Sequence, residues 1–172
     1  MPIPKVAFRR FSEKSKADQV IGQAPGTLIY TGKRHSDQVE LELFAYDEHE
    51  LKQYSATNWQ EIEDHLEKDR VNWINFAGLS NVELITQLGE HFHLDKMLLE
   101  DVLMVDQRPK SEDLGEHIFF TIKMFHDRTQ NGIEYEHVSF VLGENYVISF
   151  QEIPEDIFGL LRDRLINSYG KI

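Results

Sequence analysis

Two short apolar segments separated by a three-residue turn constrain the fold of this chain more than any other feature. Apolar side chains recur at every second position in 138–142 and again in 146–150. Gly143-Glu144-Asn145, between them, favours a tight reversal of the chain. The pattern predicts a β-hairpin of two antiparallel strands. The fold must therefore contain a sheet in which neighbouring strands are antiparallel.

Five further segments have a strand-like composition, so we expect a sheet of about seven strands. Strict alternation makes 39–47 the clearest of the five, because its apolar residues fall on one face and Glu40 and Glu42 on the other. Asn131-Gly132 favours a further hairpin turn. The predicted strands are 27–32, 39–47, 50–56, 71–79, 116–127, 135–142 and 146–152.

Four helices are predicted among these strands. Asn58, Ser80 and Asp95 carry side chains that cap helix N-termini, and Pro154 suits a first helical position. The predicted helices are 59–68, 81–92, a third from 95 to a break at 108–109, and a fourth from 154 onward. Because the helices cluster in the middle of the chain, the elements predict an α/β (α+β) fold, with a mixed, largely antiparallel sheet of about seven strands flanked by helices.

Charge and composition exclude several classes of protein. The net charge of −12 over 172 residues is unlike that of nucleic-acid-binding proteins, so we expect no nucleic-acid partner. The absence of cysteine excludes disulfides and thiolate zinc sites. No apolar run approaches the roughly 20 residues that cross a bilayer. We expect a flexible basic N-terminal arm over 1–25, followed by a single soluble domain over 26–172.

The segment LLEDVLMVDQRPK, at 98–110, combines an apolar helical pattern with acidic side chains. Met97, Leu98, Val102 and Val105 predict one buried stripe. The proline at position 109 disfavours helix at the residue before it, so the chain is expected to continue there as an extended strand. The acidic residues of this segment are therefore expected on a helix that is otherwise built for burial.

Glu100, Asp101 and Asp106 are the candidate metal ligands of this segment. Mg²⁺ prefers oxygen ligands and retains several waters, so one or two carboxylates at the edge of a helix suffice to bind it. Adjacent residues of a helix point about 100° apart, so only a metal ion or a second subunit would use both Glu100 and Asp101. The alternative interpretation is a solvated acidic face without a ligand.

Other chemistries have weaker support. His91 and His93 are two residues apart, and on a helix such side chains point in different directions, which argues against a shared zinc ion. No nucleotide-binding loop, zinc-protease motif or nucleophile motif is complete in the sequence. A hydrolase that uses Glu100, Asp101 and a histidine with a metal ion is the least favoured hypothesis, and we predict that the chain is not an enzyme.

Four segments resemble, in the same order, parts of the CorA family of magnesium and cobalt transporters. They are WINFAGL (73–79), HLDKMLLEDVLMVDQRPK (93–110), EHVSFVLGENYVISFQE (136–152) and DIFGLLRDRL (156–165). The second is the most specific, since it is similar to the family's acidic helix followed by Gln-Arg-Pro-Lys. The resemblance is strong over 71–172 and covers the first 70 residues only in general style.

The resemblance implies the N-terminal cytoplasmic domain of such a transporter, at the inner face of the cell membrane. Family members are homo-pentamers in which Mg²⁺ (or Co²⁺) bound between neighbouring cytoplasmic domains favours the closed pore, and no organic cofactor is implied. Glu100 and Asp101 match the family's sensing carboxylates, which are expected to stay unpaired until the ion and a neighbouring subunit arrive. The stalk and transmembrane helices would follow Ile172, so the chain is expected to be a fragment that contacts the membrane only through them.

The sequence departs from the family pattern at two places. Leu94-Asp95-Lys96 stands where the family has His-Pro, and Asp106 stands where some members have histidine. Two alternatives to a magnesium and cobalt transporter stay open. One is a zinc-transporting relative of the same family, and the other is a free-standing soluble protein-interaction module.

Overall fold

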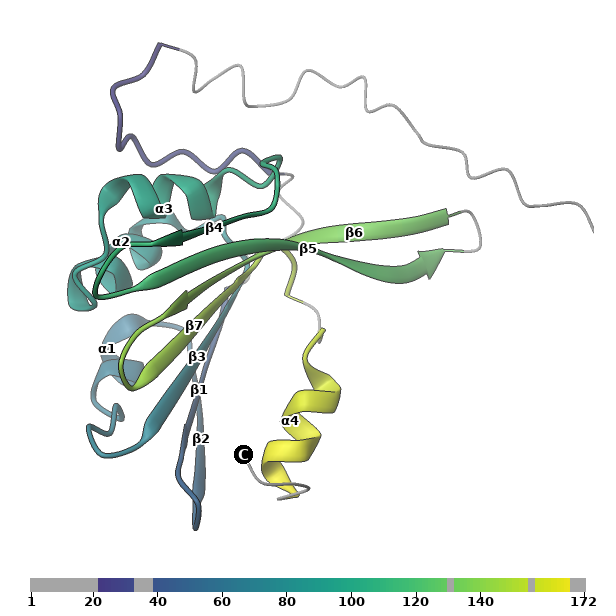
Figure 1. Ribbon diagram of the computed structural model, residues 1–172. Coiled ribbons are helices and arrows are strands. Elements are labelled where there is room, and N and C mark those ends of the chain that lie inside the picture. Colours follow the sequence, from purple (N-terminus) through teal and green to yellow (C-terminus); the bar gives the residue numbers. More distant parts are fainter. Residues whose placement is uncertain (1–21, 33–38, 130–131, 155–156, 168–172) are drawn as a thin grey trace, which may run out of the picture.

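The computed structural model describes residues 22–32, 39–129, 132–154 and 157–167, and the strands in these ranges form one sheet (Figure 1). The strand order is β2-β1-β3-β7-β6-β5-β4, and all neighbours are antiparallel except β3 and β7. The strands are β1 (Glu40–Tyr46), β2 (Leu51–Ala56), β3 (Val71–Ala77), β4 (Lys110–Asp113), β5 (Ile118–Thr129), β6 (Gly132–Leu142) and β7 (Tyr146–Gln151). The predicted mixed, largely antiparallel sheet of about seven strands is confirmed.

Helices cover both faces of this sheet (Figure 1). They are α1 (Trp59–Glu63), α2 (Val82–His91), α3 (Lys96–Leu103) and α4 (Gly159–Ile166). α1, α2 and α3 bury one face in a core that includes Ile74, whereas α4 lies on the other face, where Phe158 packs against Trp73. Trp73 and Ile74 are adjacent in β3, so this strand is buried on both faces. Within the described residues, no helix has the length and apolar character needed to span a membrane.

The hairpin that dominates the sequence forms as predicted. β6 and β7 pair in antiparallel register from Val138 opposite Gln151 to Leu142 opposite Val147. The Gly143 N–H donates to the Tyr146 carbonyl at 2.9 Å. A Cβ atom at position 143 would overlap the Tyr146 ring, so a larger residue there would displace that side chain. Asn131, in the other predicted turn, lies outside the described residues.

The prediction of a strand at 27–32 is wrong, and β4 takes its place in the count. Residues 27–32 adopt no strand conformation and instead lie against the end of α3, where the Thr31 N–H donates to the Leu103 carbonyl at 3.0 Å. β4 follows Pro109, where an extended chain was expected, and pairs with β5 at the edge of the sheet. Most of the predicted N-terminal arm lies outside the described residues.

Helix caps were easier to predict than helix ends. Asn58 and Asp95 cap α1 and α3 as expected, accepting the N–H groups of Glu61 and Met97 at 3.0 and 2.7 Å. α1, however, ends near Glu63 rather than near residue 68. The Asn72 side chain, at the start of β3, bonds both the N–H and the carbonyl of Glu67 and so turns the chain back toward the sheet.

The starts of α2 and α4 also differ from the prediction. Asn81, rather than Ser80, caps α2, because its Oδ1 accepts the Leu84 N–H at 3.1 Å. α4 begins at Gly159 and not at Pro154, after Phe158 has entered the core. Among the described residues no side chain caps this helix, because Phe158 is the N-cap residue and its ring has no hydrogen-bond acceptor.

Candidate functional site

α3 presents the acidic residues at the edge of the helical layer. Its buried side chains are Leu98, Leu99, Val102 and Leu103, which pack into the core beneath α2 and α3. Met97, predicted as part of the buried stripe, is instead 61% exposed. Leu98, Val102 and Val105 are buried as predicted, and Leu99 and Leu103 widen the buried side. Glu100 and Asp101 lie at its half-buried border.

α3 is shorter than predicted because the N-terminal segment terminates it. The helix ends at Leu103, well before the predicted break at Arg108-Pro109. The Thr31 hydroxyl donates to the Leu103 carbonyl and accepts the Val105 N–H, both at 3.2 Å, which satisfies backbone groups that a longer helix would pair internally. Asp106 consequently lies in the turn after α3 and is exposed, rather than on the helix.

Asp101 has two side-chain partners, both from the stretch that follows α3. Its Oδ1 accepts a hydrogen bond from Gln107 Nε2 at 2.7 Å, and its Oδ2 accepts one from Lys110 Nζ at 2.5 Å. The Lys110 ammonium also donates to Glu112 Oε1 at 2.9 Å. Burial lowers the pKa of Lys110, but the hydrogen bonds to Asp101 and Glu112 outweigh it, so the pKa lies above its ordinary value. The expectation that Asp101 is unpaired in one chain is therefore wrong.

Glu100 faces a different neighbour from Asp101. Its Oε2 accepts the backbone N–H of Gly26 at 2.8 Å, which ties the N-terminal segment to α3. Gly26 has a φ of +80°, a conformation that favours glycine, and a Cβ there would lie 3.2 Å from the Lys96 Cβ. The close approach of the chain to Glu100 therefore depends on glycine at position 26.

A buried histidine lies on the sheet face beneath this site. His137, in β6, is 2% exposed; its Nε2 is 3.2 Å from Ser139 Oγ, and its Nδ1 has no hydrogen-bond partner in the described part of the chain. Burial and the charge of Lys123 lower its pKa to about 4, while Asp106 and Asp101 oppose that shift. Burial therefore keeps the imidazole neutral near pH 7, and the carboxylates around α3 offset only part of this effect.

The three candidate carboxylates are not gathered into one cluster. Glu100 and Asp101 have separate partners, and Asp106 lies in the exposed turn. Among the described residues, no three histidine, aspartate or glutamate side chains come together in a way that would hold a metal ion. The Asp101 side chain is 22% exposed, and a partly exposed carboxylate suits an ion such as Mg²⁺ that keeps most of its waters.

Gln107 and Lys110 are the functional candidates that sequence reasoning missed. Both belong to the Gln-Arg-Pro-Lys stretch, which was interpreted as a helix stop and as part of the resemblance to the CorA family, with no role assigned to either residue. Their approach to Asp101 depends on the turn after α3 and on the pairing of β4 with β5. The sequence signal was that Lys110 follows Asp101 by nine residues. This spacing alone does not show that the chain folds back to bring the two side chains together.

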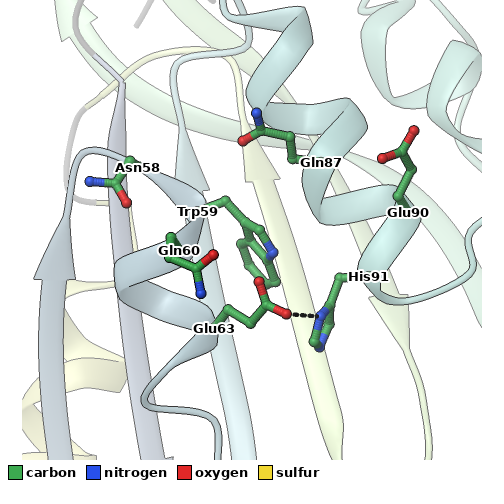
Figure 2. Close-up of a pocket in the computed structure, with 7 residues that line it drawn as sticks. All are labelled: Asn58, Trp59, Gln60, Glu63, Gln87, Glu90 and His91. Carbon is green, nitrogen blue, oxygen red and sulfur yellow. Dashed lines mark hydrogen bonds and ion pairs between the residues drawn. The ribbon is translucent and has the colours of Figure 1, made fainter.

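The two histidines weighed for zinc have different surroundings. His91 lies in a shallow pocket of about 540 Å³ between α1 and α2 (Figure 2). Its Nδ1 is 3.0 Å from Glu63 Oε1, and its ring centroid is 5.1 Å from that of Trp59. His93 is exposed, with a φ of 53°, beyond the end of α2. His91 therefore bridges two helices, whereas His93 faces solvent.

The similarity to known proteins covers more of the chain than the four segments that resemble the CorA family. A family model described as CorA-like Mg²⁺ transporter protein matches residues 68–171. A protein named cobalt/magnesium transport protein CorA, from Thermotoga maritima, is 34% identical over 161 residues, which cover 93% of this chain and 46% of that protein. The chain thus spans about half the length of this relative.

Solved structures share the fold at low sequence identity. The cytoplasmic domain of ZntB from Vibrio parahaemolyticus has a TM-score of 0.58 at 16% identity, over 75% of this chain and 50% of that one. The CorA magnesium transporter of Methanocaldococcus jannaschii has a TM-score of 0.54 at 10% identity, over 80% of this chain and 39% of that one. These two structures support the fold alone. The family match over 68–171 shows more: the chain belongs to the family of CorA-like Mg²⁺ transporter proteins, which are transporters and not enzymes.

Proposed function

We propose that this chain is the cytoplasmic regulatory domain of a CorA-type Mg²⁺/Co²⁺ transport channel, at the inner face of the cell membrane. Glu100, Asp101 and Asp106 would contribute half of a divalent-cation site, and a neighbouring subunit of a homo-pentamer would contribute the rest. The 34% identity to the Thermotoga cobalt/magnesium transport protein supports this choice of ions.

The position of Asp101 is the observation that carries the proposal. Its side chain lies at the half-buried border of α3 and is 22% exposed, with Gln107 on one carboxylate oxygen and Lys110 on the other. Glu100 is adjacent and half buried, and Asp106 is exposed in the next turn. Acidic groups placed this way attract a divalent cation, and oxygen donors from a second chain can complete its coordination.

The mechanism is linkage between ion binding and assembly. An ion that binds better to the closed, tightly packed pentamer stabilises that state by its difference in affinity between the closed and open states. Without the ion, carboxylates brought together at a subunit interface repel one another, since like charges at short distance disfavour ionisation and close approach. Loss of cytoplasmic Mg²⁺ would then loosen the interface and favour the open pore.

The decisive variant is Asp101→Ala in a full-length transporter that carries this domain. We expect the Mg²⁺ concentration that half-inhibits transport to rise about tenfold, the change that corresponds to losing roughly 1.4 kcal/mol of binding free energy. Transport into liposomes can be followed with a fluorescent Mg²⁺ indicator while Mg²⁺ is varied on the domain side.

Glu48→Ala is the matched control for this measurement. Glu48 is exposed in the turn between β1 and β2, at the opposite edge of the sheet from β4. The control removes the same charge without touching α3, so its half-inhibiting concentration should equal that of the wild type. Unchanged inhibition in the Asp101→Ala protein would refute the role of Asp101.

A further inference from the structure

We infer that Lys110 is a built-in competitor for the divalent cation: its ammonium occupies the Asp101 carboxylate and must be displaced when the ion binds, an inference that rests on the proposed function. Lys110 Nζ lies 2.5 Å from Asp101 Oδ2, the oxygen that Gln107 does not hold. A metal ion that approaches this oxygen meets a positive charge already in place. The Lys110 ammonium thus occupies the position at Asp101 that the cation would take.

The two partners of Asp101 differ in charge and bind different carboxylate oxygens, which supports this role of Lys110. Gln107 is neutral and binds Oδ1, so it can keep the carboxylate oriented whether or not an ion is present. Lys110 carries a full charge and binds Oδ2, so it cannot share that oxygen with Mg²⁺ without electrostatic repulsion. Of the two residues, Lys110 alone should change the affinity for the ion through its charge.

A second carboxylate, that of Glu112, is available to the Lys110 ammonium when it leaves Asp101. Its Nζ already donates to Glu112 Oε1 at 2.9 Å, and the Glu112 side chain is 44% exposed. Glu112 lies two residues along β4, so a change in the flexible lysine stem moves the ammonium from a shared position to Glu112 alone. Release of Asp101 therefore leaves the ammonium with a carboxylate partner.

The backbone of Lys110 is held in place while its side chain exchanges partners. The Lys110 N–H donates to Thr121 Oγ1 at 3.2 Å, and β4 pairs with β5 from Lys110 opposite Thr121 onward. The ammonium also lies 5.7 Å from the centre of the Phe119 ring. The exchange needs only side-chain rotation, so Lys110 can set the threshold of cation binding without refolding the site.

Mn²⁺ binding to the 172-residue chain tests the competition directly. Mn²⁺ takes the same oxygen ligands as Mg²⁺ and broadens the amide NMR signals of nearby residues, here those of 100–112. Lys110→Met keeps the aliphatic stem and removes the charge. We expect it to lower the Mn²⁺ concentration for half-maximal broadening by about fivefold, as for the loss of one partly exposed ion pair.

Two further variants make the result specific to the charge at position 110. Lys52 lies on β2, at the far edge of the sheet, and its Nζ is 2.8 Å from Glu67 Oε1. Lys52→Met breaks this surface pair and should leave the Mn²⁺ concentration for half-maximal broadening unchanged. Lys110→Arg retains the charge and should bind Mn²⁺ no more tightly than the wild type. A Lys110→Met midpoint equal to that of the wild type, or a Lys110→Arg midpoint as low as that of Lys110→Met, overturns the inference.

Asp101→Asn separates this inference from the proposed function. If broadening of 100–112 disappears in Asp101→Asn but Lys110→Met behaves like the wild type, Asp101 binds the ion and Lys110 does not compete for it. If broadening persists in Asp101→Asn, the proposed function fails at this residue, and the competition fails with it.

Discussion

His137 shows at the residue scale how burial lowers the pKa of a titratable group, with nearby charges as smaller contributions. The imidazole is almost fully buried in β6, beneath the end of α3, and faces Lys123 on β5. Burial and Lys123 favour its neutral form, whereas Asp101 and Asp106 favour the charged form. Because its pKa falls from about 6.5 when unfolded to about 4 when folded, the folded chain binds fewer protons than the unfolded chain between these values.

Acidification should therefore destabilise this protein through His137. As the pH falls from about 6.5 to about 4, the unfolded state gains a proton that the folded state resists, which costs up to about 3 kcal/mol of stability. Urea unfolding at pH 7 and at pH 4.5, compared between the wild type and His137→Gln, isolates this contribution from those of the carboxylates. A variant that loses as much stability as the wild type over this range would show that His137 does not carry the effect.

Thr31 decides at the element scale where α3 ends. It is buried, and its hydroxyl and backbone N–H together satisfy the Leu103 carbonyl and the Val105 N–H. Because α3 stops there, Asp106 leaves the helix, and Gln107 turns back toward Asp101. A single threonine, more than 70 residues away in the sequence, thus shapes the candidate site.

Thr31→Val should expose the energetic role of this contact. Valine keeps the branched shape but leaves the buried Val105 N–H without its acceptor, so we expect a loss of about 1–3 kcal/mol in the free energy of unfolding. Thr27→Val, whose hydroxyl bonds the Ala24 carbonyl in an exposed turn, is the matched control and should cost much less. Chemical denaturation of both variants measures the difference. Equal losses would contradict the role assigned to Thr31.

At the scale of the whole molecule, the parallel pairing of β3 and β7 joins two antiparallel units. β1, β2 and β3 form one unit, and β4 to β7 form the other. A chain of buried hydrogen bonds crosses this junction: Trp73 Nε1 donates to Ser149 Oγ at 3.0 Å, and Ser149 Oγ donates to Asn75 Oδ1 at 2.7 Å. These side-chain hydrogen bonds form only when β3 and β7 pair in this register, so they specify how the two units align.

Ser149→Ala should weaken this junction more than its small loss of volume suggests. The change leaves the buried indole N–H of Trp73 and the side-chain Oδ1 of Asn75 without Ser149, at a cost of about 1–3 kcal/mol. In a double-mutant cycle with Trp73→Phe, the two losses should not add, because each variant breaks the same hydrogen bond. Fully additive losses, measured by urea unfolding, would show that the two side chains act independently.

Local sequence determined a good part of this protein. The β6–β7 hairpin, the caps at Asn58 and Asp95 and the buried face of β1 follow from residues within a few positions of one another, so short-range patterning predicts them. The acidic segment was likewise recognisable, and its match to the CorA family is confirmed over 68–171.

Tertiary structure alone decided the surroundings of those acids. Residues 27–32 read as a strand in isolation, yet they pack against α3 because Thr31 finds buried partners there. Lys110 forms its ion pair with Asp101 only because β4 pairs with β5, which brings the chain back to the end of α3. Such contacts are stabilised by groups brought together on folding, and a pattern that repeats over two to four residues carries no information about them.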